Sequence, residues 1–302
     1  MNTRAMARRG FTLIELLLSL IVTAIVGAAL VRMVLGQARF MDQQAAWRGA
    51  RSVARGGVNR LFSDLRVVEA VGGVTAAAAG GQDFTVRVPY AFGIICSFTA
   101  NTGVVSLLPV DANMYAAAGH SGFAIRADNG AYAYYLSAVA DIPPVGTGNG
   151  PCNAPTLPDL RIGHGADLAL NGSPNGQVIA LAATANFLPT PKNGQIVFLY
   201  RRIRYEFKNS VMLPGRTGLF RTPLNEVGAP EEELAAPFAN TARVNFYVNN
   251  NAASQAAVPA DLTTIRGLEL LLDGMSERTP AGSTAPKTAN VRTSVFFENR
   301  PD

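Results

Sequence analysis

The sequence has few of the residues that metal centres and redox sites need. Its 302 residues include two histidines and two cysteines, and no C-x-x-C or H-E-x-x-H pattern occurs. Zinc centres and thioredoxin-like sites are built from such closely spaced side chains. The P-loop and G-x-G-x-x-G patterns of nucleotide-binding proteins are missing too. We therefore predict no catalytic residue, no metal and no cofactor, and we predict that the chain is not an enzyme.

The remaining candidates for polar chemistry are isolated. His120 and His164 each stand alone in a glycine-rich segment, where a single histidine is usually structural or exposed to solvent. Glu231, Glu232 and Glu233 form an acidic run, which we interpret as a solvated loop because it lacks the spaced oxygen ligands of a calcium loop. A membrane-tethered periplasmic enzyme or binding protein would need a convergent polar site, and the sequence offers no motif for one.

Acidic residues are absent from the first ten residues, which contain Arg4, Arg8 and Arg9. Without these three, 23 basic residues stand against 21 acidic ones. From Val67 onward there are 16 basic and 18 acidic residues. The high isoelectric point therefore belongs to the N-terminal region. Because a nucleic-acid-binding body is expected to be basic, no nucleic-acid partner is predicted.

One long apolar run is present, at residues 11–31. It contains a single ionisable group, Glu15, and about 20 apolar residues suffice for a transmembrane helix. An ordinary signal peptide would be cut near Gly27-Ala28-Ala29, but its apolar core rarely carries a carboxylate. A plain single-pass anchor explains the length. A charge in mid-membrane, however, costs on the order of 3 kcal/mol and marks a functional candidate unless it can reach water at the interface.

The residues at the start of the run account for all of these features together. Arg8-Arg9-Gly10-Phe11, followed four residues later by Glu15, resembles the cleavage and methylation motif of type IV prepilins. The resemblance implies that a prepilin peptidase cuts between Gly10 and Phe11 on the cytoplasmic side and that Phe11 is then N-methylated. Glu15 becomes the fifth residue of the mature chain. We expect it to act in assembly, by pairing with the Phe11 amine of a neighbouring subunit.

The resemblance also implies partners and a location. The partners are the prepilin peptidase, the inner membrane, and other pilins or pseudopilins that associate through the N-terminal helix. The positive-inside rule does not fix the orientation, because Arg32 and Arg39 flank the other end of the span. The orientation rests on the resemblance, which implies a cytoplasmic leader, a single inner-membrane span and a C-terminal domain in the periplasm or in a filament.

Helical periodicity continues beyond the span to about residue 71. One apolar face is predicted to pack on the body of the same chain. This face comprises Trp47, Ala50, Ala54, Val58, Leu61, Phe62, Leu65 and Val68. A second face carries Arg48, Arg51, Arg55 and Arg66, which are either solvated or paired with an acidic patch on a neighbouring subunit. The glycines of this helix either weaken it or let neighbouring elements approach closely.

After Gly72 and Gly73 the periodicity becomes that of strands. The predicted strands are 84–88, 94–98, 104–108, 123–126, 132–136, 178–183, 196–207, 244–248, 265–272 and 291–297. Asp128-Asn129-Gly130 is a favourable hairpin turn, residues 141–176 are predicted to be a long loop, and no second helix is predicted. The fold class is α+β, with a leader at 1–10, a long helix at 11–71 whose part 11–31 spans the membrane, and a mostly antiparallel β domain at 72–302.

The two cysteines, Cys96 and Cys152, lie far apart in the β domain. An exported chain can join them in one disulfide. Two separate, partly buried thiols are the alternative, because the sequence does not show that the two Cα atoms come close enough for a bridge.

A second resemblance lies in the C-terminal half. The runs YRRIRYEF at 200–207, GLFR at 218–221, IRGLEL at 265–270 and VRTSVFFENR at 291–300 are similar to minor pilins of the W type and minor pseudopilins of the J type. The body is long for the J type, which favours the W type. Resemblance to the W type implies a minor type IV pilin that helps to initiate or cap a pilus. Resemblance to the J type implies the alternative, a minor pseudopilin of a type II secretion system.

Overall fold

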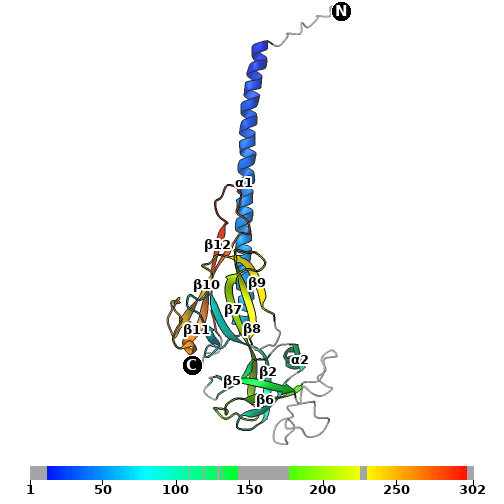
Figure 1. Cartoon of the computed structure of the whole chain (residues 1–302), viewed down its shortest axis with the longest axis vertical. Coiled ribbons are helices and arrows are strands. Elements are labelled where there is room, and N and C mark those ends of the chain that lie inside the picture. Colours follow the sequence, from blue (N-terminus) through cyan, green and yellow to red (C-terminus); the bar gives the residue numbers. More distant parts are fainter. Residues whose placement is uncertain are drawn as a thin grey trace, which may run out of the picture.

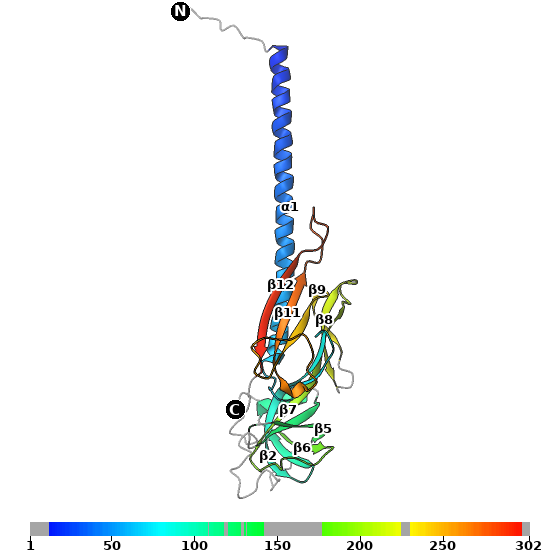
Figure 2. The same ribbon diagram turned by 90° about the vertical axis from the view of Figure 1, so that its left-hand side faces the viewer.

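A long N-terminal helix projects from a β-rich body (Figures 1 and 2). The computed structural model describes residues 12–107, 109–117, 120–127, 130, 132–141, 177–224 and 230–297. The helices are α1 (Leu13–Leu65) and α2 (Pro109–Ala117), with a 3-10 turn η4 (Leu262–Thr264). The strands are β1 (Val74–Ala77), β2 (Asp83–Phe98), β3 (Thr102–Leu107), β4 (Gly122–Arg126), β5 (Tyr132–Asp141), β6 (Gln177–Ala183), β7 (Ile196–Asn209), β8 (Thr217–Leu224), β9 (Glu232–Phe238), β10 (Arg243–Val248), β11 (Ile265–Met275) and β12 (Thr288–Phe296). The α+β class is confirmed.

Helix α1 has 53 residues, which corresponds to about 80 Å at a rise of about 1.5 Å per residue. It ends at Leu65, six residues before the predicted end, where the Arg66 N–H still donates to the Phe62 carbonyl at 3.2 Å. The residues that follow the helix include Val68 and Ala70, which are buried in the core.

The second half of α1 packs on the sheet, as the apolar periodicity predicts. Its buried residues are Ala50, Ala54, Gly57, Leu61 and Leu65. Small residues make this contact close, since a Cβ added at Gly274 of β11 would lie 2.2 Å from the Ala50 carbonyl oxygen. The prediction was wrong for Trp47, which is 41% exposed.

The sheet divides into two parts. Neighbouring strands run in the order β1-β2-β3-β6-β5-β4-β7-β8-β9-β11-β10, with β12 on β11 and an additional pairing of β2 with β7. Because of that additional pairing, β2, β3, β6, β5, β4 and β7 close into a six-stranded antiparallel barrel. The remaining strands form the open sheet that carries α1. The barrel lies at the end of the body remote from the N-terminus (Figure 1).

Two strands belong to both parts. β2 has 16 residues and β7 has 14, and each leaves the barrel to continue into the open sheet. The sequence predicts two strands in place of β2, because Pro89 and Gly93 interrupt its apolar pattern. The register shift between Pro89 and Ala91 absorbs the proline without ending the strand. β7 pairs first with β4 and then, from Arg202 onward, with β8. Ser121, which directly precedes β4, connects these two partners of β7. Its hydroxyl donates to the Leu224 carbonyl at 2.9 Å and accepts from the Arg202 N–H at 3.0 Å.

Each part has its own hydrophobic core. The core of the open sheet contains Leu61, Leu65, Phe84, Tyr205 and Phe238, all at most 1% exposed. The barrel core is separate and has no residue of α1. It is formed mainly by Ile95, Val105, Leu107, Phe123, Ile125, Ile179, Leu181, Val197 and Leu199. Helix α2, which was not predicted, covers the barrel next to β2, and most of the predicted loop 141–176 lies outside the described residues.

Candidate functional site

The start of α1 is the candidate site, and its geometry is set by a capping box. Thr12 is the N-cap, with extended backbone angles of φ −73° and ψ 148°. Its hydroxyl oxygen accepts from the Glu15 N–H at 3.3 Å. One carboxylate oxygen of Glu15, Oε2, accepts from the Thr12 N–H and from the Thr12 hydroxyl, both at 3.0 Å. Two of the N–H groups that a helix start leaves without partners are satisfied in this way.

Glu15 therefore has a partner within its own chain, which the sequence analysis did not foresee. The capping contact holds the carboxylate at the N-terminal end of α1, against Thr12. Among the described contacts only Oε2 of Glu15 is used, so the second oxygen can still accept from another donor. Gly10 and Phe11, the predicted cleavage and methylation residues, lie outside the described residues.

The N-terminal half of α1 has the properties of a membrane span. Among the described helices, α1 is long and apolar enough to cross a membrane. Its most apolar stretch has a mean hydropathy of 2.5, and none of that stretch is buried against the rest of the chain. The two hydroxyls in this part are satisfied within the helix. Ser19 donates to the Leu16 carbonyl at 2.9 Å, and Thr23 donates to the Ser19 carbonyl at 2.7 Å. The outer surface of this segment is therefore apolar, as contact with lipid or other apolar helices requires.

The arginine face of α1 points to solvent. Arg48, Arg51, Arg55 and Arg66 are all exposed, and among the described salt bridges none involves them. The Arg51 guanidinium lies 4.7 Å from the centre of the Trp47 ring. This stacking gives the exposed Trp47 a polar neighbour. Both interpretations of the arginines, as a solvated face or as one that pairs with another subunit, stay predictions.

A charged contact holds the C-terminal end of α1 to the sheet. Asp64 accepts from the Arg221 Nε at 3.1 Å and from the Tyr205 hydroxyl. Burial, together with the negative charge of Asp64, raises the pKa of the Tyr205 hydroxyl, so it stays a donor at any pH the protein meets. The contact orients the helix on β7 and β8.

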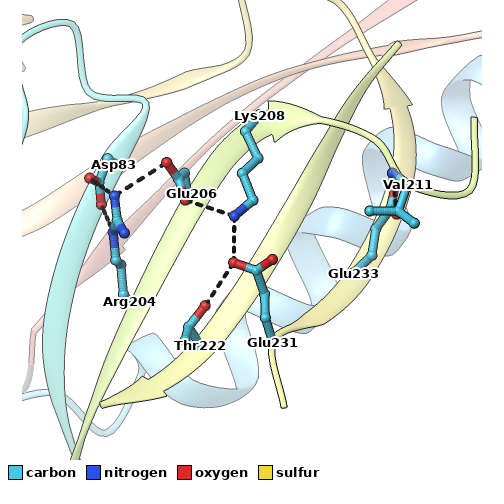
Figure 3. Close-up of polar contacts among 8 residues, drawn as sticks. All are labelled: Asp83, Arg204, Glu206, Lys208, Val211, Thr222, Glu231 and Glu233. Atoms are coloured by element: carbon cyan, nitrogen blue, oxygen red, sulfur yellow. Dashed lines mark hydrogen bonds and ion pairs between the residues drawn. The ribbon is translucent and has the colours of Figure 1, made fainter. Parts of the chain in front are cut away.

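The acidic run at 231–233 is not a solvated loop. Glu232 and Glu233 belong to β9, and Glu231 precedes it. Figure 3 shows Glu231 bonded to Lys208 and, at 3.3 Å, to Thr222, while Glu206 links Lys208 to the Arg204–Asp83 pair. The hydrogen bond from Lys208 is the main reason why the pKa of the Glu231 carboxyl lies below its usual value. Within the part of the chain that the structure describes, no cluster of metal-ligating side chains occurs.

Glu233 has a different role, which the sequence did not indicate. Its carboxylate accepts from the backbone N–H of Val211 at 2.9 Å (Figure 3). It also accepts from the backbone N–H of Met212 at 3.1 Å. It also accepts from the Ser210 hydroxyl. The run therefore stabilises the β7–β8 hairpin, because Glu231 and Glu233, two residues apart, both bind residues of this hairpin.

Two other residues that the sequence analysis singled out, Cys96 and His120, lie in or next to the barrel. Cys96, on β2, is buried and disulfide-bonded. Cys152 lies outside the described residues, so their pairing stays a prediction. His120 contacts the Tyr90 hydroxyl through Nδ1 at 3.3 Å, and burial lowers its pKa to about 4. His164 lies outside the described residues too.

Comparison with known proteins supports the interpretation of the N-terminus. The profile of the prokaryotic N-terminal methylation motif matches residues 5–31 of the chain. Searches of curated proteins and of solved structures gave no significant match.

An apolar helix that carries this motif and continues into an antiparallel β domain defines the class of pilin-like proteins. The chain is a type IV prepilin-like protein, with a pilin-like or pseudopilin-like role. The motif implies processing by a prepilin peptidase and pilin-type assembly. Together with the apolar helix, it is consistent with anchoring in the inner membrane.

Proposed function

We propose that the chain is a minor type IV pilin, a structural subunit that helps to initiate or cap pilus assembly through its N-terminal helix. The observation that carries the proposal is the division of α1 into two halves. The first half is apolar, carries the methylation motif and is not packed against its own chain. The second half is buried in the body. Such a helix leaves its first half available to the helices of neighbouring subunits.

The barrel supports a position at the tip of the filament. A pilus that grows from the membrane carries its first subunits at the distal end, where no further subunit lies beyond them. The barrel adds its bulk at the end of the body remote from the membrane helix (Figure 1). In the middle of a filament this bulk would occupy space into which the next body must fit.

Glu15 is the residue proposed to set the register of assembly. Cleavage after Gly10 would create an α-amine at Phe11, and the capping box holds Glu15 at the same end of the helix. A charge in an apolar environment is stabilised by an opposite charge and penalised without one. The free carboxylate oxygen of Glu15 is proposed to accept the amine of a staggered neighbour, so that the pair favours assembly over the lone subunit.

Two variants separate this pairing from the capping role. Glu15→Gln removes the charge but keeps an oxygen that can complete the capping box. Thr12→Ala removes the capping hydroxyl and leaves the charge. We expect both variants to be cleaved, with Glu15→Gln at least tenfold less abundant in complexes purified with the partner pilins and Thr12→Ala close to the wild type. Normal recovery of Glu15→Gln would refute the pairing.

The choice between pilus and secretion system is tested in the cell. Deletion of the protein is expected to remove surface pili while protein secretion continues. A strain that keeps its pili and loses secretion would identify a minor pseudopilin of a type II secretion system. We also propose that the body lies in the periplasm before assembly and that the protein acts as a structural subunit without catalytic activity.

A further inference from the structure

The C-terminal strand β12 lies at the edge of the open sheet. It pairs with β11 along its whole length without a register shift. Among the described strands no other pairs with it, and in Figure 2 it forms the outer margin of the body. An open strand edge presents unpaired N–H and C=O groups, and it is a template for another strand unless it is protected.

The hydrogen bonds to β11 show which residues of β12 face outward. The N–H of Phe297 donates to the Arg266 carbonyl at 2.9 Å, and at the other end the N–H of Ser276 donates to the Lys287 carbonyl at 2.8 Å. In an antiparallel pair such bonded positions recur at every second residue. The odd-numbered residues of β12 therefore bond to β11. The even-numbered residues, Thr288, Asn290, Arg292, Ser294 and Phe296, direct their N–H and C=O groups to the open side.

Three of the usual protections of an edge strand, namely short length, proline and a bulge, are missing from β12. β12 is nine residues long, contains no proline and has no bulge in its pairing with β11. Its inward side chains Ala289 and Val295 are buried, so the strand is firmly held. An edge that is long, regular and held in place needs no rearrangement before it accepts a further strand.

The side chains on the solvent face indicate the chemistry of the occupant. Arg292 is 62% exposed, whereas Glu269, which binds its Nε at 2.5 Å, is only 6% exposed. The other nearby carboxylate, Asp273, already accepts from Thr241 and Asn290 at 2.5 Å each. Arg292 is therefore the one charged side chain of β12, it is exposed, and β12 has no acidic residue.

We propose that the open edge of β12 binds an extended, acidic segment of another polypeptide by adding a strand to the sheet. Backbone hydrogen bonds to the even-numbered residues provide the affinity, and a carboxylate opposite Arg292 provides the selectivity. A second copy of this chain is disfavoured, because full antiparallel overlap of two β12 strands places Arg292 opposite Arg292. Like charges directly opposite each other destabilise a strand pair.

The test uses the full chain in detergent micelles and a fluorescent, end-capped peptide of nine residues. The peptide alternates threonine and valine and has glutamate at its centre. Ser294→Pro removes one outward N–H and the hydroxyl that contacts Tyr247 at 2.9 Å. Ser294→Ala removes the same hydroxyl and keeps the N–H, so it is the matched control. We expect Ser294→Pro to weaken binding at least tenfold and Ser294→Ala to change it less than twofold.

Two further peptides keep the test decisive if Ser294→Pro does not fold. N-methylation of alternate backbone nitrogens should abolish binding to the unaltered chain, and lysine in place of glutamate should weaken it at least fivefold. Equal binding of the N-methylated peptide, or equal binding to folded Ser294→Pro and Ser294→Ala, would overturn strand addition. Tighter binding of a peptide that copies residues 288–296 would assign the edge to a second copy and overturn the proposed partner.

Discussion

Two adjacent glycines of α1 provide a sharp test of how the helix meets the sheet. A Cβ added at Gly57 would lie 2.8 Å from Cζ of Phe238 and 3.2 Å from Cδ1 of Leu272, whereas one added at Gly56 meets nothing within 4 Å. Phe238 is 1% exposed, and its ring packs edge-on against Phe207 at a centroid distance of 5.7 Å. The ring therefore has no free space to move into.

The expected effects of alanine differ in sign at the two positions. Alanine is favoured over glycine in a helix by about 1 kcal/mol, so Gly56→Ala should stabilise the body by about that amount. Gly57→Ala has the same helix preference but overpacks the core, which costs about 1 to 3 kcal/mol. The two variants should therefore differ by about 1 to 3 kcal/mol, or about 2 to 12 °C in Tm for a body of this size.

The assay is thermal unfolding of the full chain in detergent, followed by near-ultraviolet circular dichroism. Because both variants change the unfolded chain in the same way, their difference isolates the contact with the sheet. Phe238→Leu removes the ring atom that clashes, so in that background Gly57→Ala should recover about 1 kcal/mol or more. Equal stability of Gly56→Ala and Gly57→Ala would refute the close approach of α1 to β9 and β11.

Three further predictions concern the barrel and the leader. Burial lowers the pKa of His120 from 6.5 to about 4, so its contribution to stability is complete above about pH 6.5 and is lost as the pH falls towards 4. At about 1.36 kcal/mol per pKa unit, the loss of unfolding free energy is about 3 kcal/mol. Urea unfolding at several pH values should show this loss in the unaltered protein, and the His120→Gln variant should lack it. Mass spectrometry of the mature protein should find N-methyl-Phe11 at its terminus, whereas a chain that starts near Val31 would indicate an ordinary signal peptide. Non-reducing peptide mapping should find Cys96 linked to Cys152, a bridge that stabilises the fold by about 4 kcal/mol in the chain-entropy model, and two free thiols in protein from the cell envelope would contradict it.

The sequence by itself determined the N-terminal helix and the fold class of this protein. The motif around Gly10, Phe11 and Glu15 depends on neighbouring residues, and the methylation-motif profile matches it. The apolar face of α1 was also readable, because residues three and four apart share one side of a helix whatever lies opposite. The α+β class followed from the change of periodicity after Gly73. These features are local, and local features are what a linear sequence displays.

Only the tertiary structure decided the rest. Closure of the barrel depends on the pairing of β2 with β7, which are separated by about a hundred residues, and no local pattern encodes such a distant contact. The end of α1 at Leu65 could not be read from the helical periodicity, which continues to about residue 71. The different roles of Glu231 and Glu233 likewise depend on which groups of the β7–β8 hairpin lie within reach. The open edge of β12 is also a tertiary property, since an edge exists only once every other strand has found its neighbours.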